Sequence, residues 1–416
     1  MKKTTDPYAA LRFPEFRYFI TAQFLFTVGI LIQEVVLSYY LYEVTNDPLA
    51  LGLIGLFEAI PYISLALFGG HVADLYDKKR IVQICFSVVI ICSIILLWAT
   101  HPSTHITDTK LLTKVIYFVV FLLGVARGFY GPAWSSLKPF LVPAEHYSNS
   151  ASWSSQFWQT GMILGPASAG FMYSYLGLTN TLYLVVVIFI LVFIIASFIS
   201  KKPVPKKNEG NIFESLKEGI SFVSKNKILL YAIMLDMFSV LFGGVVAILP
   251  VFAKDILHVG AEGLGILRAA PGIGAVLMML ISAYYSPTHS PWRNMLIAVA
   301  GFGVTTLVFA FSNNFWLSVG ALFLTGVFDS ISVVVRQTIL QVLPPDNMRG
   351  RVSSVNGIFV SCSNELGAFE SGVTTKIFGA VNSVLFGGAM TLVIVSYLYF
   401  QSKELFKVKL VKAEEK

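Results

Sequence analysis

The chain has 416 residues, of which 56% are hydrophobic and only 13% are charged, and its mean hydropathy is +0.73. Soluble proteins carry about 25% charged residues, so this composition excludes a soluble globular protein and predicts an all-α membrane protein with many spans. Its three cysteines lie in apolar stretches without the spacing of a metal site, and an odd number gives no complete disulfide framework.

Twelve apolar stretches are each long enough to cross a bilayer, which takes about 20 residues as a helix. The first six are Phe16–Tyr42, Ala50–Gly70, Ile81–Thr100, Leu111–Ala133, Ala151–Leu176 and Thr181–Ile199. The second six are Ile228–Ala253, Leu264–Tyr285, Trp292–Phe311, Phe315–Leu343, Val352–Phe378 and Ala380–Phe400. The first stretch is too long for the apolar region of a cleavable signal peptide, so we expect it to remain as a span.

A polar segment at 200–227 separates the two sets of six spans. We therefore expect an N-terminal six-helix bundle at 1–199, a cytoplasmic linker at 200–227, a C-terminal six-helix bundle at 228–402 and a cytoplasmic tail at 403–416. The second half of the linker has apolar residues at helical spacing between charges, at Ile212, Phe213, Leu216, Ile220 and Val223. This pattern predicts an amphipathic helix lying on the inner membrane surface.

Most of the 30 lysines and arginines fall in the tails and in the loops that would share one membrane face. Because positive residues collect on the cytoplasmic side, we expect both termini in the cytoplasm and the chain in the plasma (inner) membrane. The formal net charge of +7 thus reflects topology and gives no reason to expect a nucleic-acid partner. We expect a monomer whose surroundings are the lipid bilayer.

An internal repeat relates the two sets of spans. One offset aligns Gly124 with Gly326, Pro143 with Pro345, Gly165 with Gly367, and Arg127 with Asp329. A second offset aligns Pro61 with Pro271 and Glu58 with Arg268. A charge in hydrocarbon costs about 2.5–3.5 kcal/mol even on a mild scale, so the four aligned charges indicate function. Opposite charges at equivalent places of parallel repeats indicate two bundles that rock about a midplane site.

Residues 70–80 read Gly-His-Val-Ala-Asp-Leu-Tyr-Asp-Lys-Lys-Arg and follow the predicted second span. This stretch resembles the loop motif of the major facilitator superfamily, with Asp77 where that family more often has glycine. Gly70 would allow close helix approach, and Asp74 would attract a helix N-terminus. The resemblance covers nearly the whole chain and implies the major facilitator fold. It also implies a conformational role for Gly70, Asp74, Asp77, Lys78, Lys79 and Arg80. The general tendency of basic residues to collect at the anionic cytoplasmic surface would also explain Lys78, Lys79 and Arg80.

The predicted fifth span contains small residues and a proline, at Gly161, Gly165, Pro166 and Gly170. This pattern resembles the motif of exporters and antiporters in the same superfamily, although ordinary close packing of helices would also explain the glycines. The fourth span departs from the family because Gly124 stands at the usual arginine position and Arg127 follows one turn later. Stretches at 128–133, 141–143, 329–336, 348–352 and 363–372 resemble the siderophore (enterobactin-type) and macrolide exporter branch.

Proton coupling needs a carboxylate inside the membrane, since all six histidines lie in loops or at helix ends. An acid beside an arginine can change its protonation when cargo displaces its partner. The candidate proton carriers are Asp329 first and Asp236 second, followed by Glu365 and Glu34. The alternative is that such charges only tie helices together, most of all at Glu34, Glu370 and Arg336, of which Arg336 is also deep enough to snorkel inward.

Three further charges complete the predicted pathway. We expect Arg127 to anchor an anionic substrate or to pair with the proton-carrying acid, and Glu58 and Arg268, nearer the outer face, could serve as gate charges. Aromatic residues make up 14% of the chain, and such a weakly charged cavity suits a flat amphipathic molecule. The tryptophans divide into expected interfacial anchors, Trp98, Trp292 and Trp316, and those that either face the cavity or pack, Trp153 and Trp158.

The sequence has no phosphate-binding loop, no zinc-protease motif and no nucleophile elbow, so we expect neither an enzyme nor a cofactor nor a metal site. We expect a secondary active transporter, a proton-coupled antiporter that exports a siderophore or drug-like amphipathic molecule by alternating access. Two alternatives stay open at this point. One is a proton-independent facilitator or importer of a small nutrient, and the other is a lipid flippase or a non-transporting membrane sensor.

Overall fold

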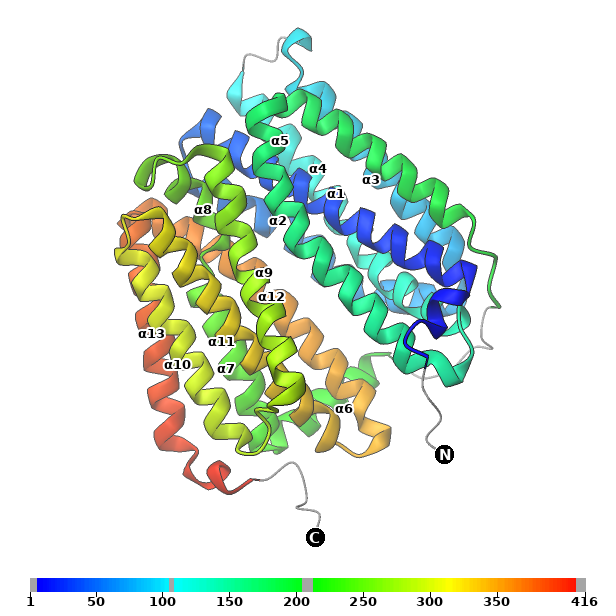
Figure 1. The fold of residues 1–416 in the computed structure, drawn as a ribbon, viewed down its shortest axis with the longest axis vertical. Coiled ribbons are helices and arrows are strands. Elements are labelled where there is room, and N and C mark those ends of the chain that lie inside the picture. Colours follow the sequence, from blue (N-terminus) through cyan, green and yellow to red (C-terminus); the bar gives the residue numbers. More distant parts are fainter. Residues whose placement is uncertain (1–5, 105–107, 204–211, 409–416) are drawn as a thin grey trace. The chain divides into compact units, whose positions relative to one another are not determined.

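The computed structural model describes residues 6–104, 108–203 and 212–408, and the regular elements in these ranges are helices (Figure 1). The chain divides into two compact units, Met1–Thr45 with Phe57–Glu209 and Asn46–Leu56 with Gly210–Lys416. The sequence predicts a division within 200–227, part of which lies outside the described residues. In the structure the short segment Asn46–Leu56 also groups with the second unit. A Cβ on its Gly52 would lie 3.0 Å from the Cα of Gly372, so this segment is held by close backbone contact.

The first unit is built from long helices that follow the predicted spans. They are α1 (Pro14–Thr45), α2 (Pro48–Leu75), of which the part from Phe57 belongs to this unit, α3 (Lys78–Thr100), α4 (Thr109–Leu137) and α5 (Tyr147–Ser197). Side chains of Asp77 and Asp108 accept backbone hydrogen bonds at the starts of α3 and α4, which satisfies exposed N–H groups there. The 51 residues of α5 hold two predicted spans joined by a kink at Gly177, whose φ of +75° favours glycine.

The second unit contains α6 (Ile212–Lys225), α7 (Lys227–Gly243), α8 (Leu249–Val251), α9 (Gly260–Tyr284), α10 (Pro291–Phe311), α11 (Phe315–Val342), α12 (Asp346–Phe378) and α13 (Ala380–Gln401). In the described part of the chain, 10 stretches are long and apolar enough to cross a membrane. The sequence predicts twelve spans, and the difference has two sources. The two spans within α5 count once, and α12 falls outside because its charged and polar residues lower its hydropathy.

The predicted span Ile228–Ala253 is interrupted, a feature that its hydropathy does not indicate. Helix α7 ends at Gly243, and short helical pieces follow it. Glycines at 243 and 244 and a proline at 250 disfavour a continuous helix here. The Ser371 hydroxyl donates to the Gly244 carbonyl at 3.0 Å, so a neighbouring helix satisfies one of the freed backbone groups.

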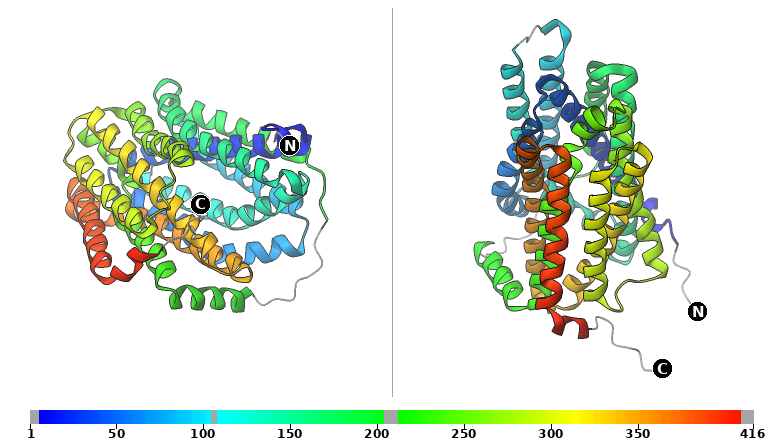
Figure 2. Two further views of the ribbon diagram at one scale, coloured as in Figure 1. Left: turned by 60° about the horizontal axis from the view of Figure 1, so that its bottom comes forward. Right: turned by 90° about the vertical axis from the view of Figure 1, so that its left-hand side faces the viewer.

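Helix α6 forms as predicted, and part of its apolar side packs on protein. A Cβ on Gly219 would lie 3.0 Å from the Arg351 carbonyl of α12, and Val223 is buried in the core of the second unit. Ile220 remains 48% exposed, whereas the side chains of residues 212 and 213 lie outside the described set. Gly219 and Val223 of α6 therefore pack on protein, beside the first turns of α12 (Figures 1 and 2), whereas Ile220 does not, and the placement of α6 on the inner membrane surface stays a prediction.

Equivalent helices pack through equivalent residues in the two units. In the first unit, Gly165 of α5 meets α1, where an added Cβ would lie 2.7 Å from the Cβ of Leu31. In the second unit, Gly367 of α12 meets α7, where an added Cβ would lie 2.9 Å from the carbonyl oxygen of Leu241. Small residues allow such close approach, so the repeat seen in the sequence corresponds to a repeated helix packing.

Candidate functional site

The first unit contains an ion pair between two of the intramembrane charges. Arg127 of α4 donates to Glu58 of α2 over 2.8 Å, and its guanidinium carbon lies 4.6 Å from the centre of the Tyr62 ring. Gly124, one turn before Arg127, brings α4 directly against Glu58 and Pro61 of α2. Stacking on Tyr62 and pairing with Glu58 hold the guanidinium in a fixed orientation.

This pair keeps much of its surface accessible. The side chain of Arg127 is 45% exposed and that of Glu58 is 25% exposed. A ligand anion could therefore reach the guanidinium without first unfolding the helix contact. The sequence indicates Arg127 and Glu58 as separate charges and gives no sign of Tyr62, because the rotation of one helix against another is not visible in the sequence.

The second unit holds a different pair, which is fully buried. Arg336 of α11 donates to Asp236 of α7, and each side chain is only 4% exposed. The Arg336 Nε atom is also buried and has no hydrogen-bond partner among the described residues. Arg336 thus binds Asp236 inside the unit. It does not extend toward the cytoplasmic membrane surface, which its depth in the span had predicted.

Asp329 lies on α11 two turns before Arg336 and is partly buried. It is within electrostatic range of both Asp236 and Arg336. Among the residues that the structure describes, Asp329 has no hydrogen bond or ion pair. The second unit therefore places an acid without a direct partner beside a buried acid–base pair.

The remaining predicted charges take varied positions. Arg268 of α9 donates to the carbonyl of Val246, in the interruption after α7, at 3.4 Å. Glu365 and Glu370 lie on α12 and are partly buried. Glu34 of α1 is exposed, so the expectation of a buried acid there is wrong.

The loop motif is organised around Asp77, the residue that departs from the family pattern. Asp77 caps α3, and its carboxylate lies 3.9 Å from Arg80 and 3.7 Å from Lys201. Lys79 donates to the Ser197 carbonyl at the end of α5 over 2.8 Å. These contacts fasten the loop to the end of α5 and to the chain that follows it.

Two expectations for the motif do not agree with the structure. Lys78 is 3% exposed and lies 5.8 Å from the centre of the Phe140 ring, so its amine packs on protein instead of facing lipid headgroups. A Cβ on Gly70 would meet no atom of the described residues within 4 Å, so no close approach seen in this structure requires glycine there. Asp74 is exposed on the last turns of α2.

The small residues of α5 pack against α1 within the first unit. A Cβ on Gly161 would lie 3.0 Å from the Cβ of Thr27, and Gly165 contacts Leu31. Pro166 and Gly170 are buried in the same region of α5. Close packing of α5 against α1 therefore explains the glycines at 161 and 165.

The tryptophans divide differently from the prediction. Trp98 and Trp316 are 59% and 70% exposed, as interfacial anchors would be. Trp292 is 0% exposed, and its indole donates to the Ser402 hydroxyl over 2.7 Å, so it is a core residue. Trp153 donates to the Pro7 carbonyl over 2.9 Å and holds the N-terminal segment on α5.

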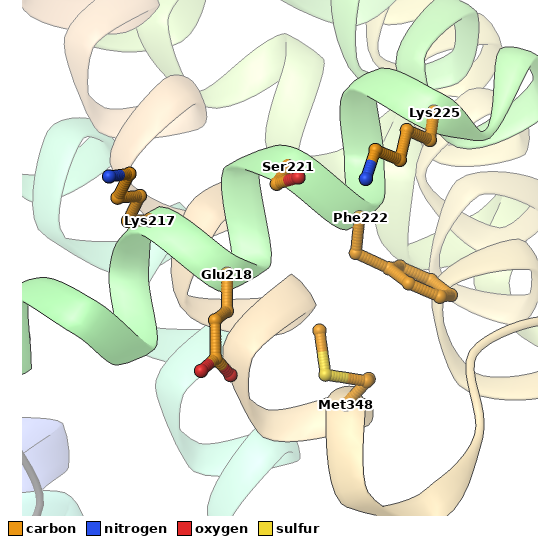
Figure 3. A pocket seen from close by; sticks show the side chains of 6 residues that line it. All are labelled: Lys217, Glu218, Ser221, Phe222, Lys225 and Met348. Atoms are coloured by element: carbon orange, nitrogen blue, oxygen red, sulfur yellow. The ribbon is translucent and has the colours of Figure 1, made fainter.

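A separate hollow lies beside α6. Its volume is about 390 Å³, and Figure 3 shows its lining side chains, Lys217, Glu218, Ser221, Phe222, Lys225 and Met348. Glu218 pairs with Arg351 of α12, which joins the two helices at this hollow. Its lining includes none of the intramembrane charges described above.

Comparison with known proteins identifies the family. The model of the Major Facilitator Superfamily matches residues 19–368. The staphyloferrin A transporter of Staphylococcus aureus is 22% identical over 95% of this chain and 98% of its own. The enterobactin exporter EntS of Salmonella choleraesuis is 22% identical over 92% of each chain. The macrolide efflux protein A of Streptococcus pyogenes is 23% identical over 87% of this chain and 90% of its own.

Solved structures agree at the level of the fold. The nucleoside transporter NupG superposes with a TM-score of 0.70 at 15% identity, covering 95% of this chain and all of that one. A POT family transporter in complex with 5-aminolevulinic acid superposes with a TM-score of 0.75 at 11% identity, covering 94% and 96% of the two chains. The chain therefore belongs to the major facilitator superfamily, whose members are multi-pass membrane transporters of small molecules and not enzymes.

Proposed function

We propose that this transporter is a proton-coupled antiporter that exports a siderophore or a drug-like amphipathic molecule by alternating access. The names of its relatives support this class of cargo, since they include siderophore and macrolide exporters. In this proposal both termini lie in the cytoplasm, the chain works as a monomer, and the six-helix bundles at 1–199 and 228–402 rock about the site.

The observation that carries the proposal is the arrangement of Asp329, Asp236 and Arg336. Asp236 is already neutralised by Arg336, and removing either partner would leave a buried charge uncompensated. Asp329 has no such partner among the residues that the structure describes, and a carboxylate in a low-dielectric span can avoid its desolvation cost by binding a proton. Asp329 is therefore the proposed proton carrier, with Asp236 holding its surroundings in place.

Arg127 is the proposed anchor for an acidic group of the cargo. A cargo anion would compete with Glu58 for the guanidinium, while the Tyr62 ring offers a flat apolar surface beside it. This combination suits an amphipathic molecule with an acidic group better than a neutral sugar. Glu365 of α12 is a further candidate for exchanging protons with the cargo pathway.

The test uses everted membrane vesicles that hold a proton gradient. Enterobactin, staphyloferrin A and a macrolide are added in turn, and a pH-sensitive dye measures whether cargo entry releases protons. We expect at least one of these probes to dissipate the gradient with the native chain, and the Asp329→Asn variant to lose that response. The matched control is Glu145→Gln, because Glu145 is a 75% exposed acid outside the spans.

The opposite results have clear meanings. Cargo movement that continues unchanged without a proton gradient would favour a facilitator or importer. Dissipation that persists in the folded Asp329→Asn variant would overturn the assignment of the proton carrier. Movement of a labelled phospholipid with none of the three probes transported would favour a lipid flippase.

A further inference from the structure

The hollow beside α6 has a wall that is built by two helices. A Cβ on Gly219 of α6 would lie 3.0 Å from the Arg351 carbonyl of α12, so the two backbones approach closely. Arg351 pairs with Glu218 of α6 and also donates to the Met348 sulfur over 3.5 Å. Glu218 and Met348 both line the hollow (Figure 3). The contacts of Arg351 therefore hold part of the lining in place.

The hollow also presents positive charge. Lys217, Ser221 and Lys225 are four residues apart, so they follow one face of α6 over a rise of about 12 Å, and all three line the hollow. Both lysines are exposed, and neither has a hydrogen-bond or ion-pair partner among the residues that the structure describes. Of the acids of α6, Glu218 is neutralised by its ion pair and Glu214 lies outside the lining. Two cations and a hydroxyl therefore remain for a ligand.

Apolar atoms complete the lining. Figure 3 shows Lys217 and Lys225 at opposite ends of the hollow, with Phe222 and Met348 along one side. Ile220 on the same helix is 48% exposed, so apolar surface continues on α6. The volume of about 390 Å³ falls within the range of roughly 300–1,000 Å³ that small-molecule sites occupy. A ligand that fits this lining carries anionic oxygens at one end and hydrocarbon at the other.

We propose that this hollow binds the headgroup of an anionic phospholipid from the inner leaflet. The phosphate oxygens accept hydrogen bonds from Lys217, Lys225 and the Ser221 hydroxyl, and the start of an acyl chain packs on Phe222 and Met348. The proposal rests on the cytoplasmic placement of α6 in the proposed function, but it does not depend on the proton carrier or on the cargo.

The bound lipid has a mechanical consequence for the second unit. Gly219 holds α6 closely on α12, so a lipid bound at α6 also fastens the first turns of α12 to the inner leaflet. A ligand that binds only the folded chain stabilises it in proportion to its occupancy. Anionic lipid should therefore raise the melting temperature of this chain more than a zwitterionic lipid does.

Native mass spectrometry of the purified full chain tests the site. Micelles contain either phosphatidylglycerol or phosphatidylcholine, and the number of bound lipids is measured as lipid is titrated. The test variant combines Lys217→Gln with Lys225→Gln. The matched control combines Lys403→Gln with Lys407→Gln, which removes the same charge from two exposed lysines near the predicted cytoplasmic tail.

We expect the affinity for phosphatidylglycerol to fall about tenfold in the test variant and less than about twofold in the control. The binding of phosphatidylcholine should be the same in all three chains. An unchanged affinity for phosphatidylglycerol in the test variant, or an equal loss in the control, would overturn the site. Glycerol phosphate is the soluble probe, and displacement of phosphatidylglycerol by it at equal concentration would mean that the site takes a free phosphate compound and not a lipid.

Melting temperatures give a second measurement on the same chains. Phosphatidylglycerol should raise the melting temperature of the native chain and of the control, and it should raise that of the test variant much less. An equal rise in all three would contradict the site. Because neither measurement involves transport, lipid binding that is lost as expected while vesicles show no proton-coupled export would mean that the proposed function fails and the lipid site stands. Proton-coupled export with unchanged lipid binding in the test variant would mean the reverse.

Discussion

The two units use one helix packing but treat their charges differently. In the first unit, Arg127 and Glu58 pair beside an aromatic ring and keep 45% and 25% of their side-chain surface. In the second unit, Arg336 and Asp236 pair with only 4% exposure each. A half-exposed pair can exchange partners with a ligand, whereas a buried pair resists exchange because separation leaves an uncompensated charge. Under the function proposed above, the first unit binds the cargo and the second unit holds the proton site.

The largest expected effect comes from breaking the buried pair. Arg336→Met leaves Asp236 buried without a partner, and we expect it to lower the free energy of unfolding by about 3–5 kcal/mol. Thermal unfolding of the purified chain in detergent measures the change. The double variant Asp236→Leu with Arg336→Met removes both charges and should recover most of the loss. A double variant as unstable as the single one would mean that packing, not charge, holds this region.

A substitution at the repeated glycine contact should have the next largest effect. Gly165→Val places a side chain where even a Cβ would lie 2.7 Å from Leu31, and overpacking of this kind costs about 1–3 kcal/mol. The melting temperature of the purified chain measures it. Gly70→Ala is the matched control, because a Cβ there meets no described atom within 4 Å and alanine favours the helix, so this chain should be at least as stable as before. Equal losses at both positions would contradict the close packing of α1 and α5.

The exposed pair in the first unit should matter more for cargo than for stability. Arg127→Lys keeps the positive charge but loses the planar group that stacks on Tyr62 and forks toward Glu58. We expect the half-saturation concentration for an acidic cargo to rise about tenfold, with a stability change of about 1 kcal/mol or less. Transport titrations measure the first quantity, with the exposed Lys114→Arg as control. An unchanged half-saturation concentration would remove Arg127 from the cargo site.

The smallest effect is expected where α6 meets α12. Glu218→Gln removes the pair with Arg351, whose side chains are 56% and 36% exposed, so we expect a loss of about 0.5 kcal/mol or less. Thermal unfolding at low and high salt checks this value. A much larger loss would mean that the ion pair, and not the contacts of Gly219 and Val223, holds α6 in place.

The sequence predicts the helices and their repeat well because both follow from local patterns. Hydropathy predicts the positions of the spans. The spacing of residues aligns Gly124 with Gly326 and Pro61 with Pro271, and these glycines and prolines are in contact in the structure. Glycine allows two helix backbones to approach closely, so a repeated pattern of glycine and proline predicts a repeated helix contact. The interruption after Gly243 also had a signal, in the neighbouring glycines and the proline at 250.

The charge partners could not be predicted in the same way. Pairing Arg127 with Glu58, or Arg336 with Asp236, depends on how each helix is rotated and how far each side chain reaches. Hydropathy also could not predict the burial of Trp292. This residue stands at the end of a span in the sequence, but in the structure it is 0% exposed and donates a hydrogen bond to Ser402. Depth along a span can be counted from the sequence, whereas the direction in which a side chain points depends on the neighbouring helices.

The interruption after α7 has a consequence for how this span opens. A continuous helix opens its backbone cooperatively, but short pieces can separate one at a time at lower free energy. Amide hydrogens around Val246 should therefore exchange with deuterium sooner than those in the middle of α10. Comparing the exchange rates of these amides with and without cargo would show whether cargo binding changes the opening of this segment, in the native chain and without an attached probe.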